Sequence, residues 1–234
     1  MIKNSILLCT RNEEKYIEST IINLNESISD LEIVIVDDHS QDNTIQIIEK
    51  LKNNLDIKLI KRKEKSGLAS AFLRGIIECS GENIGWVDTN QSDLCKRFPD
   101  MIKDLDNYDL ILLSRYVEGG GDNRDFLRVL CSKLLNLLCR VILSNSIKDY
   151  TSSIFIMKKN VLNETNLISN GHGEFFIEFL FDVYKKNYKI KEIPYIQERD
   201  DDDNNSKSSP NLFRFFFLGF FYIMRVLLIR FRRE

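Results

Sequence analysis

Residues 32–44, with the sequence EIVIVDDHSQDNT, constrain the fold more than any other part of the chain. The run Ile33–Val36 is purely β-branched, which is typical of a strand buried on both faces of a parallel sheet. Asp37 and Asp38 follow directly, and the polar residues after them suit a helix start. Open α/β sheets bind ligands beyond the carboxyl ends of their strands. The stretch therefore predicts two acids at a ligand-binding edge, although a solvated loop after a core strand gives the same pattern.

The remainder of the first half repeats this order of strand and helix. We expect strands at 5–9, 32–36, 57–60 and 83–87, with helices ending near 25 and covering 43–52 and 66–79. This alternation predicts a doubly wound, mainly parallel sheet. Further on we expect a polar loop at 88–93, a helix at 98–105, a strand at 109–113, a flexible glycine linker at 119–121, a helix at 124–143, an edge strand at 149–157, a helix at 174–186 and a last strand at 190–196.

Composition excludes several classes of protein. A formal net charge of -2 gives no electrostatic case for nucleic-acid binding. The five cysteines form no CxxC pair, and two histidines make a zinc site improbable. Neither a GxGxxG nor a Walker-type loop is present, which argues against a dinucleotide or ATP site.

Residues 210–234 are rich in aromatic and basic side chains and predict an amphipathic helix. At about 100° per residue, Arg214, Arg225 and Arg232 fall on one narrow stripe of an otherwise apolar surface. The apolar run between the first two is shorter than the ~20 residues of a membrane span. We expect 211–233 to lie in a membrane interface, with arginines reaching anionic headgroups. The alternative is a helix that docks on its own domain or on a second subunit.

Polar side chains follow the expected strands at four places: Thr10 to Glu13, Asp37 and Asp38, Asp88 to Asp93, and Ser114 with Arg115. Carboxylates at separate strand ends suit hydrogen bonding to a base or ribose and the binding of Mg²⁺ or Mn²⁺ together with phosphates. Arginines suit a diphosphate. The combination predicts a nucleotide diphosphate bound with a divalent metal.

The ordered motifs resemble those of family-2 glycosyltransferases with the GT-A fold, in particular the dolichol- or polyprenyl-phosphate hexose (mannose) synthases. They are Cys9–Glu14, Val36–Thr44, Gly67–Ala71, Val87–Asn90, Leu113–Tyr116, Arg128 with Ser132, Asp149–Ser153, Glu178, Glu192–Pro194, Arg199, and Ser206 with Lys207. The resemblance covers nearly the whole chain up to about Ser208. It implies a catalytic domain at 1–209, with a nucleotide-sugar half at 1–115 and an acceptor half at 116–209, followed by the helix at 210–234.

The resemblance also implies roles for single residues. Thr10, Asn12, Glu13, Asp37 and Asp38 are expected to hold the nucleotide. Asp88 is expected beside the metal and the diphosphate. Arg115, Arg128 and Lys207 are expected to bind phosphates of donor or acceptor. Asp149 and the loop after it are expected to line the acceptor side.

One motif departs from the family pattern. The metal motif Asp-x-Asp reads Asp88-Thr89-Asn90 here. Asn90 can offer a neutral carbonyl oxygen, which weakens metal binding, and Asp93 is a candidate to replace the lost carboxylate. The other outcome is loss of metal dependence or of catalysis.

The implied reaction is inverting transfer of a hexose from a sugar nucleotide of the GDP-mannose or UDP-glucose type to an isoprenoid lipid phosphate, at the cytoplasmic face of a membrane. One alternative acceptor is a sugar hydroxyl, for which Asp149 or Asp93 would act as base. Two further alternatives differ in function. One is a sugar nucleotidyltransferase, whose glycine-rich phosphate loop is absent from this sequence, and the other is a catalytically degenerate subunit that binds sugar nucleotides. The sequence leaves the base, the sugar and the oligomeric state open.

Overall fold

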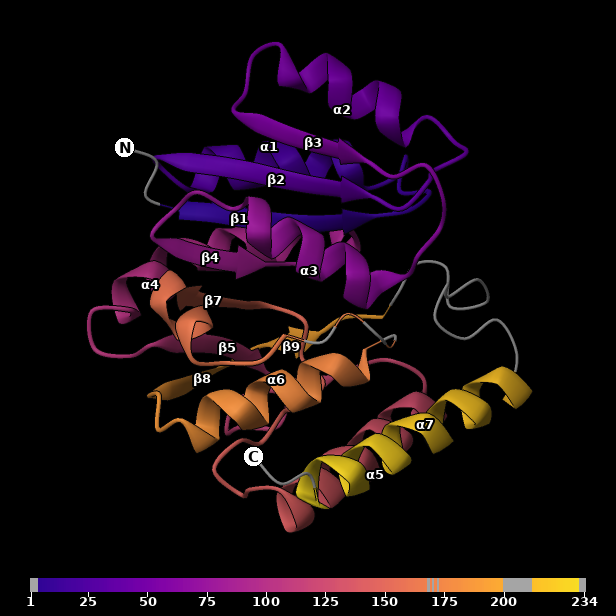
Figure 1. The fold of residues 1–234 in the computed structure, drawn as a ribbon. Coiled ribbons are helices and arrows are strands. Elements are labelled where there is room, and N and C mark those ends of the chain that lie inside the picture. The colour runs from indigo at the N-terminus through magenta and orange to yellow at the C-terminus, as the bar shows by residue number, and fades with distance from the viewer. Residues whose placement is uncertain (1–3, 168, 170, 172, 200–211, 232–234) are drawn as a thin grey trace.

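The computed structural model describes residues 4–167, 169, 171, 173–199 and 212–231. Its frame is a seven-stranded sheet of order β3-β2-β1-β4-β7-β5-β8 with helices on both faces (Figure 1). The strands are β1 (Asn4–Thr10), β2 (Leu31–Asp37), β3 (Ile57–Lys61), β4 (Asn83–Trp86), β5 (Leu110–Ser114), β6 (Gly121–Asp122), β7 (Phe155–Lys158), β8 (Ile190–Pro194) and β9 (Ile196–Gln197). The helices are α1 (Ile17–Ser27), α2 (Thr44–Lys52), α3 (Leu68–Glu78), η1 (Thr89–Arg97), α4 (Phe98–Asp104), α5 (Phe126–Ile142), η2 (Lys159–Asn163), α6 (Glu174–Lys185) and α7 (Leu212–Phe231).

The first four strands of the sheet are parallel, as the strand–helix alternation predicts. Leu7 of β1 pairs with Val34 of β2 on one side and with Trp86 of β4 on the other. Alternate residues along each strand enter two separate cores, because successive side chains of a strand point to opposite faces. Leu7 packs with α3 and α6, whereas Ile6 packs with α1 and α4. Burial on both faces explains the continuous apolar runs of these strands.

The second half of the sheet differs from the expected arrangement. The segment expected as an edge strand at 149–157 contributes only β7, which is central and runs antiparallel to both β4 and β5. The edges are β3 and β8. Residues 149–153 stay outside the strand because their polar groups bind other parts of the chain, as the contacts of Asp149 with Arg115 show.

Two expected loops are ordered elements. The polar stretch after β4 forms the 3₁₀ helix η1, which is kinked at Gln91 and held to α1 where Thr20 Oγ1 donates to the carbonyl of Thr89 at 2.6 Å. The glycine run expected as a linker pairs instead with β9, since Gly121 belongs to β6. A Cβ at Gly120 would lie 2.7 Å from the carbonyl oxygen of Arg115, so this close approach requires glycine.

Helix α7 docks on the domain with one face and exposes the other. It lies beside α5, at the end of the molecule far from α2 (Figure 1). Val226 and Ile229 are buried in the core shared with α6, and Arg225 Nε forms an ion pair with Glu178 of α6 at 3.0 Å. The expectation that Arg225 reaches headgroups is therefore wrong, because this arginine faces the domain. The side chains of Arg214 and Arg232 lie outside the described residues.

Within the described part of the chain, no helix combines the length and apolar character that crossing a membrane requires. The apolar exposed face of α7 instead includes Phe220, Met224, Leu227, Leu228 and Phe231.

Gly85 of β4 provides a test of the packing between sheet and helix. A Cβ there would lie 2.5 Å from Ile6 Cδ1 and 2.9 Å from Phe98 Cε1. We expect Gly85→Ala to lower the free energy of unfolding by about 1–3 kcal/mol, because extra volume in a filled core causes strain. Denaturant unfolding measures this change. In the control Gly219→Ala, where no atom lies within 4 Å of the added methyl, stability should hold or rise; equal losses in both variants would contradict the packing.

Candidate active site at the strand ends

Asp37 ties the ends of β1 and β2 together. Its carboxylate accepts hydrogen bonds from Thr10 Oγ1 at 2.9 Å, from the backbone N–H of Ser40 at 2.8 Å and from Ser40 Oγ at 2.5 Å. The residue is fully buried. A carboxylate has about four acceptor positions, so these bonds leave little capacity for a ligand. In this structure Asp37 shapes the strand ends through Thr10 and Ser40.

Asp38 fixes the loop that follows β3. It accepts from the backbone N–H groups of Ser66 and Gly67 at 2.9 and 3.0 Å, and it pairs with Arg62 at 3.1 Å. Arg62 also donates to Ser70 Oγ at 2.8 Å. Arg62 was not among the predicted site residues, although its position directly after β3 is a signal that could have indicated it.

The loop after β1 is held against the start of α2. The backbone N–H of Asn12 donates to Ser40 Oγ at 2.9 Å, and its side-chain oxygen accepts from the N–H of Gln41 at 2.8 Å. The N–H of Glu13 donates to Thr44 Oγ1 at 2.8 Å. Asn12 has a φ of 54°, a left-handed conformation that asparagine tolerates better than most residues. Thr10, Asn12, Glu13, Asp37 and Asp38 therefore converge, as the parallel strands predict.

Asp88 lies at the centre of this edge, after β4. Ser153, just before β7, donates its hydroxyl to Asp88 Oδ2 at 2.5 Å. Burial raises the pKa of the nearby Cys9 thiol, and the negative charges of Asp88 and Asp38 raise it further. Asp88 is half-buried, whereas Asn90 and Asp93 are exposed on η1.

The described residues contain no group of three acidic, histidine or cysteine side chains arranged to hold a metal ion. Asp88 and Asn90 nevertheless offer the carboxylate and amide oxygens that Mg²⁺ and Mn²⁺ prefer. The donor set fits a cation whose remaining ligands come from phosphates and water, which is how Mg²⁺ is commonly bound.

Arg115 and Asp149 form a buried pair between the end of β5 and the loop before β7. The guanidinium donates from Nε to Oδ2 and from Nη2 to Oδ1, both at 2.8 Å, and Nη2 also donates to Thr151 Oγ1 at 2.7 Å. Burial alone would raise the pKa of Asp149, but the charge and hydrogen bonds of Arg115 hold it below its usual value. Asp149 is therefore a weak base here, and Arg115 is turned inward.

Glu192 of β8 holds the loop that carries this pair. Its two oxygens accept the backbone N–H groups of Lys148 and Asp149 at 2.7 and 2.9 Å. Tyr116, directly after Arg115, links the end of β5 to α5, because its Oη donates to Ser132 Oγ at 2.8 Å. Arg128 is half-buried on the same helix, four residues before Ser132. Lys207 lies outside the described residues.

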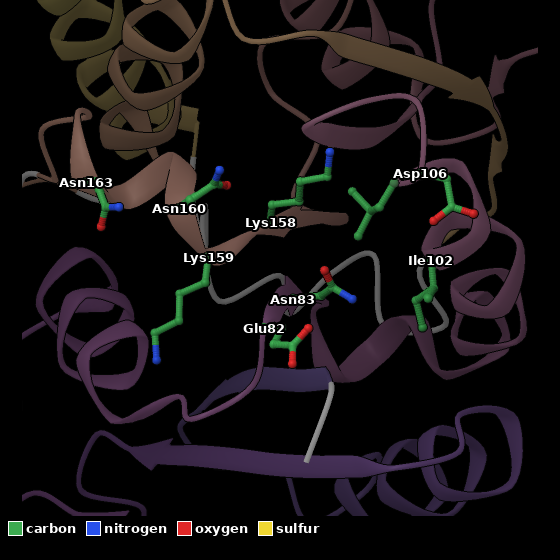
Figure 2. Close-up of a pocket in the computed structure, with 9 residues that line it drawn as sticks. Glu82, Asn83, Ile102, Asp106, Lys158, Lys159, Asn160 and Asn163 are labelled. Carbon is green, nitrogen blue, oxygen red and sulfur yellow. The ribbon is translucent and has the colours of Figure 1, made fainter. Parts of the chain in front are cut away.

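A cavity of about 620 Å³ opens at the other end of the strands, where β4 begins and β7 ends (Figure 2). Its two lysines have partners: Lys158 Nζ contacts Asp109 at 3.2 Å, and Lys159 Nζ donates to the carbonyl of Cys79 at 2.8 Å. The residues singled out for chemistry lie at the opposite edge of the sheet, so we do not assign this cavity to the reaction.

The buried pair makes stability depend on pH with a defined sign. Because the folded-state pKa of Asp149 is lowered, its contribution is complete above the unfolded-state pKa of about 3.9 and is lost as pH falls through the folded-state value. We expect Asp149→Asn to reduce the free energy of unfolding by about 3 kcal/mol near neutral pH, since Arg115 is left buried without its partner. Denaturant unfolding across pH measures this, and the difference from wild type should shrink in acid.

The control is Lys103→Gln, which removes an exposed pair with Asp100 at 3.5 Å and should cost less than about 1 kcal/mol. A loss in Asp149→Asn that is no larger than the control, or that is the same at every pH, would contradict the assigned role of the pair.

Comparison with known proteins identifies the family. A model described as Glycosyl transferase family 2 matches residues 5–165. The dolichol-phosphate mannosyltransferase of Pyrococcus furiosus is 32% identical over 200 residues, covering 83% of this chain and 56% of the relative. That of Saccharomyces cerevisiae is 27% identical over 138 residues, covering 58% of this chain and 51% of the relative. The chain thus spans about half the length of the curated relatives it matches.

Solved structures agree on the fold. Glucosyl-3-phosphoglycerate synthase from Mycobacterium tuberculosis, solved with Mn²⁺, UDP and glucosyl-3-phosphoglycerate, superposes with a TM-score of 0.72 over 99% of this chain and 81% of that chain, at 16% identity. TarS from Staphylococcus aureus gives 0.61 over 98% and 72%, at 20% identity. These likenesses support the expected GT-A architecture. Because the family model covers most of the sheet and all the strand ends up to β7, the chain belongs to glycosyl transferase family 2.

Proposed function

We propose that this chain transfers a hexose, with inversion, from a nucleotide-diphosphate sugar to an isoprenoid lipid phosphate at a membrane surface. The observation that carries the proposal is the hydrogen bond between Tyr116 Oη and Ser132 Oγ at 2.8 Å. It joins the polar strand ends to α5, a helix whose outer face is apolar. A reaction between a water-soluble donor and a lipid acceptor needs a place where polar strand ends meet an apolar surface.

The donor side uses the edge formed by β1, β2 and β4. Asp37 and Asp38 act as positioning residues, because their carboxylates bind the loops at Ser40 and Gly67. The loop from Thr10 to Glu13 and the carboxylate of Asp88 then face the nucleotide and its diphosphate. The M. tuberculosis neighbour was solved with UDP and Mn²⁺, which supports a nucleotide diphosphate and a divalent cation here. Asp88 and Asn90 are the residues that would hold Mg²⁺ or Mn²⁺, which neutralises the charge of the leaving diphosphate.

The acceptor side favours a phosphate over a sugar hydroxyl. A hydroxyl needs a general base; of the two candidates, Asp149 is locked to Arg115 with a lowered pKa, and Asp93 is exposed on η1. A phosphate monoester has a second pKa of about 6 and is largely ionised at neutral pH, so it attacks without a base. We infer that Arg128, half-buried on α5, binds that phosphate, and the names of the two mannosyltransferase relatives support a dolichol-type acceptor.

The outer face of α5 and the exposed face of α7 supply the membrane contact. On α5 the exposed apolar residues recur at helical spacing: Leu127, Leu130, Leu134, Leu137 and Val141. Adjacent α7 adds Phe220, Leu228 and Phe231. Contiguous apolar surface of this kind marks an interaction site, and cations at its flank match an anionic lipid surface. The cytoplasmic face is the side on which sugar nucleotides meet the membrane in this scheme.

The experiment that tests the reaction is transfer of radiolabelled hexose from GDP-mannose and UDP-glucose to a short-chain polyprenyl phosphate in detergent, with Mn²⁺ present. We expect label in the lipid product from one donor. The controls are the dephosphorylated polyprenol and a free sugar acceptor. Transfer to the free sugar but not to the lipid phosphate would overturn the acceptor assignment, and binding of donor without any transfer would favour a degenerate subunit.

Leu134→Glu tests the membrane face. Leu134 is 56% exposed at the middle of the α5 stripe, and burying a new carboxylate in the lipid interface is unfavourable. We expect the variant to lose about tenfold in binding to lipid vesicles, measured by sedimentation. Ile77→Glu is the matched control, because Ile77 is 68% exposed on α3. If both variants bind vesicles like the wild type, the α5 face is not the membrane contact.

A further inference from the structure

A cavity of about 440 Å³ lies between α5 and the loop that follows β5. Four cationic side chains line it: Lys133 and Arg140 from α5, Lys148 from the loop after that helix, and Arg115, which is paired with Asp149. Gly120 forms part of the wall by packing against the backbone of Arg115. At about 30 Å³ per water in the liquid, the volume corresponds to on the order of ten waters, which is room for a glycerophosphate group.

Asn145 draws two of these cations together. Arg140 Nε donates to Asn145 Oδ1 at 2.8 Å. Lys148 Nζ donates to the same oxygen at 3.2 Å and to the Asn145 backbone oxygen at 2.6 Å. A guanidinium has five N–H donors, so Arg140 keeps donors for a ligand. Two positive charges that share one oxygen repel each other, and a bound anion would offset that repulsion.

The acid Asp122 also lines the cavity, but its charge is already paired. Asp122 pairs with Arg124 at 2.7 Å and lies 3.5 Å from Arg115. Across the described ranges, Lys133, Arg140 and Lys148 form no ion pair within 4.0 Å. The cavity therefore presents uncompensated positive charge.

The cavity lies along one flank of the apolar stripe of α5. At about 100° per residue, Lys133 and Arg140 fall beside Leu137, which both lines the cavity and belongs to the stripe. The opposite flank carries Leu135 and Leu138, which pack into the core shared with α7. The apolar stripe thus runs between α7 and the cationic cavity, so an interface that buries the stripe places the cavity at the level of the headgroups.

We propose that this cavity binds the phosphodiester headgroup of an anionic phospholipid. The end of the cavity held by Arg140 and Lys148 lies away from the proposed acceptor phosphate, because Arg140 is twelve residues beyond Arg128, about 18 Å along the helix. The proposal rests on the membrane association proposed above and not on the transfer reaction. A seated headgroup would fix the orientation of α5 on the bilayer.

The test measures binding of the full chain to phosphatidylcholine vesicles with and without phosphatidylglycerol. The double variant Arg140→Gln with Lys148→Gln removes the two clustered charges. The control double variant Lys50→Gln with Lys52→Gln removes two charges from α2, at the far end of the molecule (Figure 1). We expect the wild type to prefer phosphatidylglycerol vesicles, the cavity variant to lose about tenfold of that preference, and the control to change less than about twofold.

Lys133→Gln is a second test if the double variant folds poorly, because Lys133 is exposed on α5 and its side chain is not part of the core. We expect this variant to lose about threefold of the preference for phosphatidylglycerol. Equal losses in the cavity and control doubles would show a general charge effect and overturn the proposal. Calorimetric titration with glycerol 3-phosphate and inorganic phosphate is the soluble arm. Saturable binding of either in the absence of lipid, abolished by the cavity variant, would assign the site to a free phosphate and overturn the lipid source.

The detergent transfer assay separates this proposal from the reaction, because it needs no vesicles. We expect the cavity variant to transfer hexose to the short-chain acceptor at the wild-type rate. If the wild type binds the headgroup but transfers no hexose, only the proposed function is contradicted. If the wild type transfers hexose but shows no preference for phosphatidylglycerol vesicles, only the cavity proposal is contradicted.

Discussion

The carboxylate of Asp37 is the constraint on which the candidate site depends. It is buried at the end of β2 and binds Thr10 of β1 and Ser40 of the following loop. Ser40 Oγ in turn accepts the N–H of Asn12. Removing such a buried acceptor leaves its donors unsatisfied, at about 1–3 kcal/mol each. The arrangement of these strand ends therefore depends on one buried acid and the two loops that it orders.

A second buried contact orders the loop before β7. Arg115 and Asp149 neutralise each other inside the protein, so neither is open to substrate in this structure. Their role is to hold the loop before β7 against the end of β5. Arg128, expected from the sequence to bind a substrate phosphate, is half-buried on α5, and the proposed headgroup site at Arg140 lies further along the same helix. The same helix carries the apolar stripe proposed above as the membrane contact.

Local sequence patterns predicted what is local in the structure. Each strand–acid junction, such as β2 with Asp37, is contiguous, so its place at the sheet edge could be inferred. The central position of β7 could not, because an antiparallel insertion between β4 and β5 depends on pairings far apart in the chain. The Arg115–Asp149 pair spans 34 residues and was equally hidden. Docking of α7 on its own domain was only the alternative prediction, because a stripe of arginines looks the same in the sequence whether it faces lipid or an acid such as Glu178.

The most direct test of the account is calorimetric titration of the chain with GDP and with UDP, each with and without Mn²⁺. The account predicts that one nucleotide binds and that Mn²⁺ tightens the binding, because Asp88 and Asn90 provide too few ligands to hold the cation without a diphosphate. Failure of a folded chain to bind either nucleotide, with or without the metal, would contradict the assignment of the strand ends as a donor site.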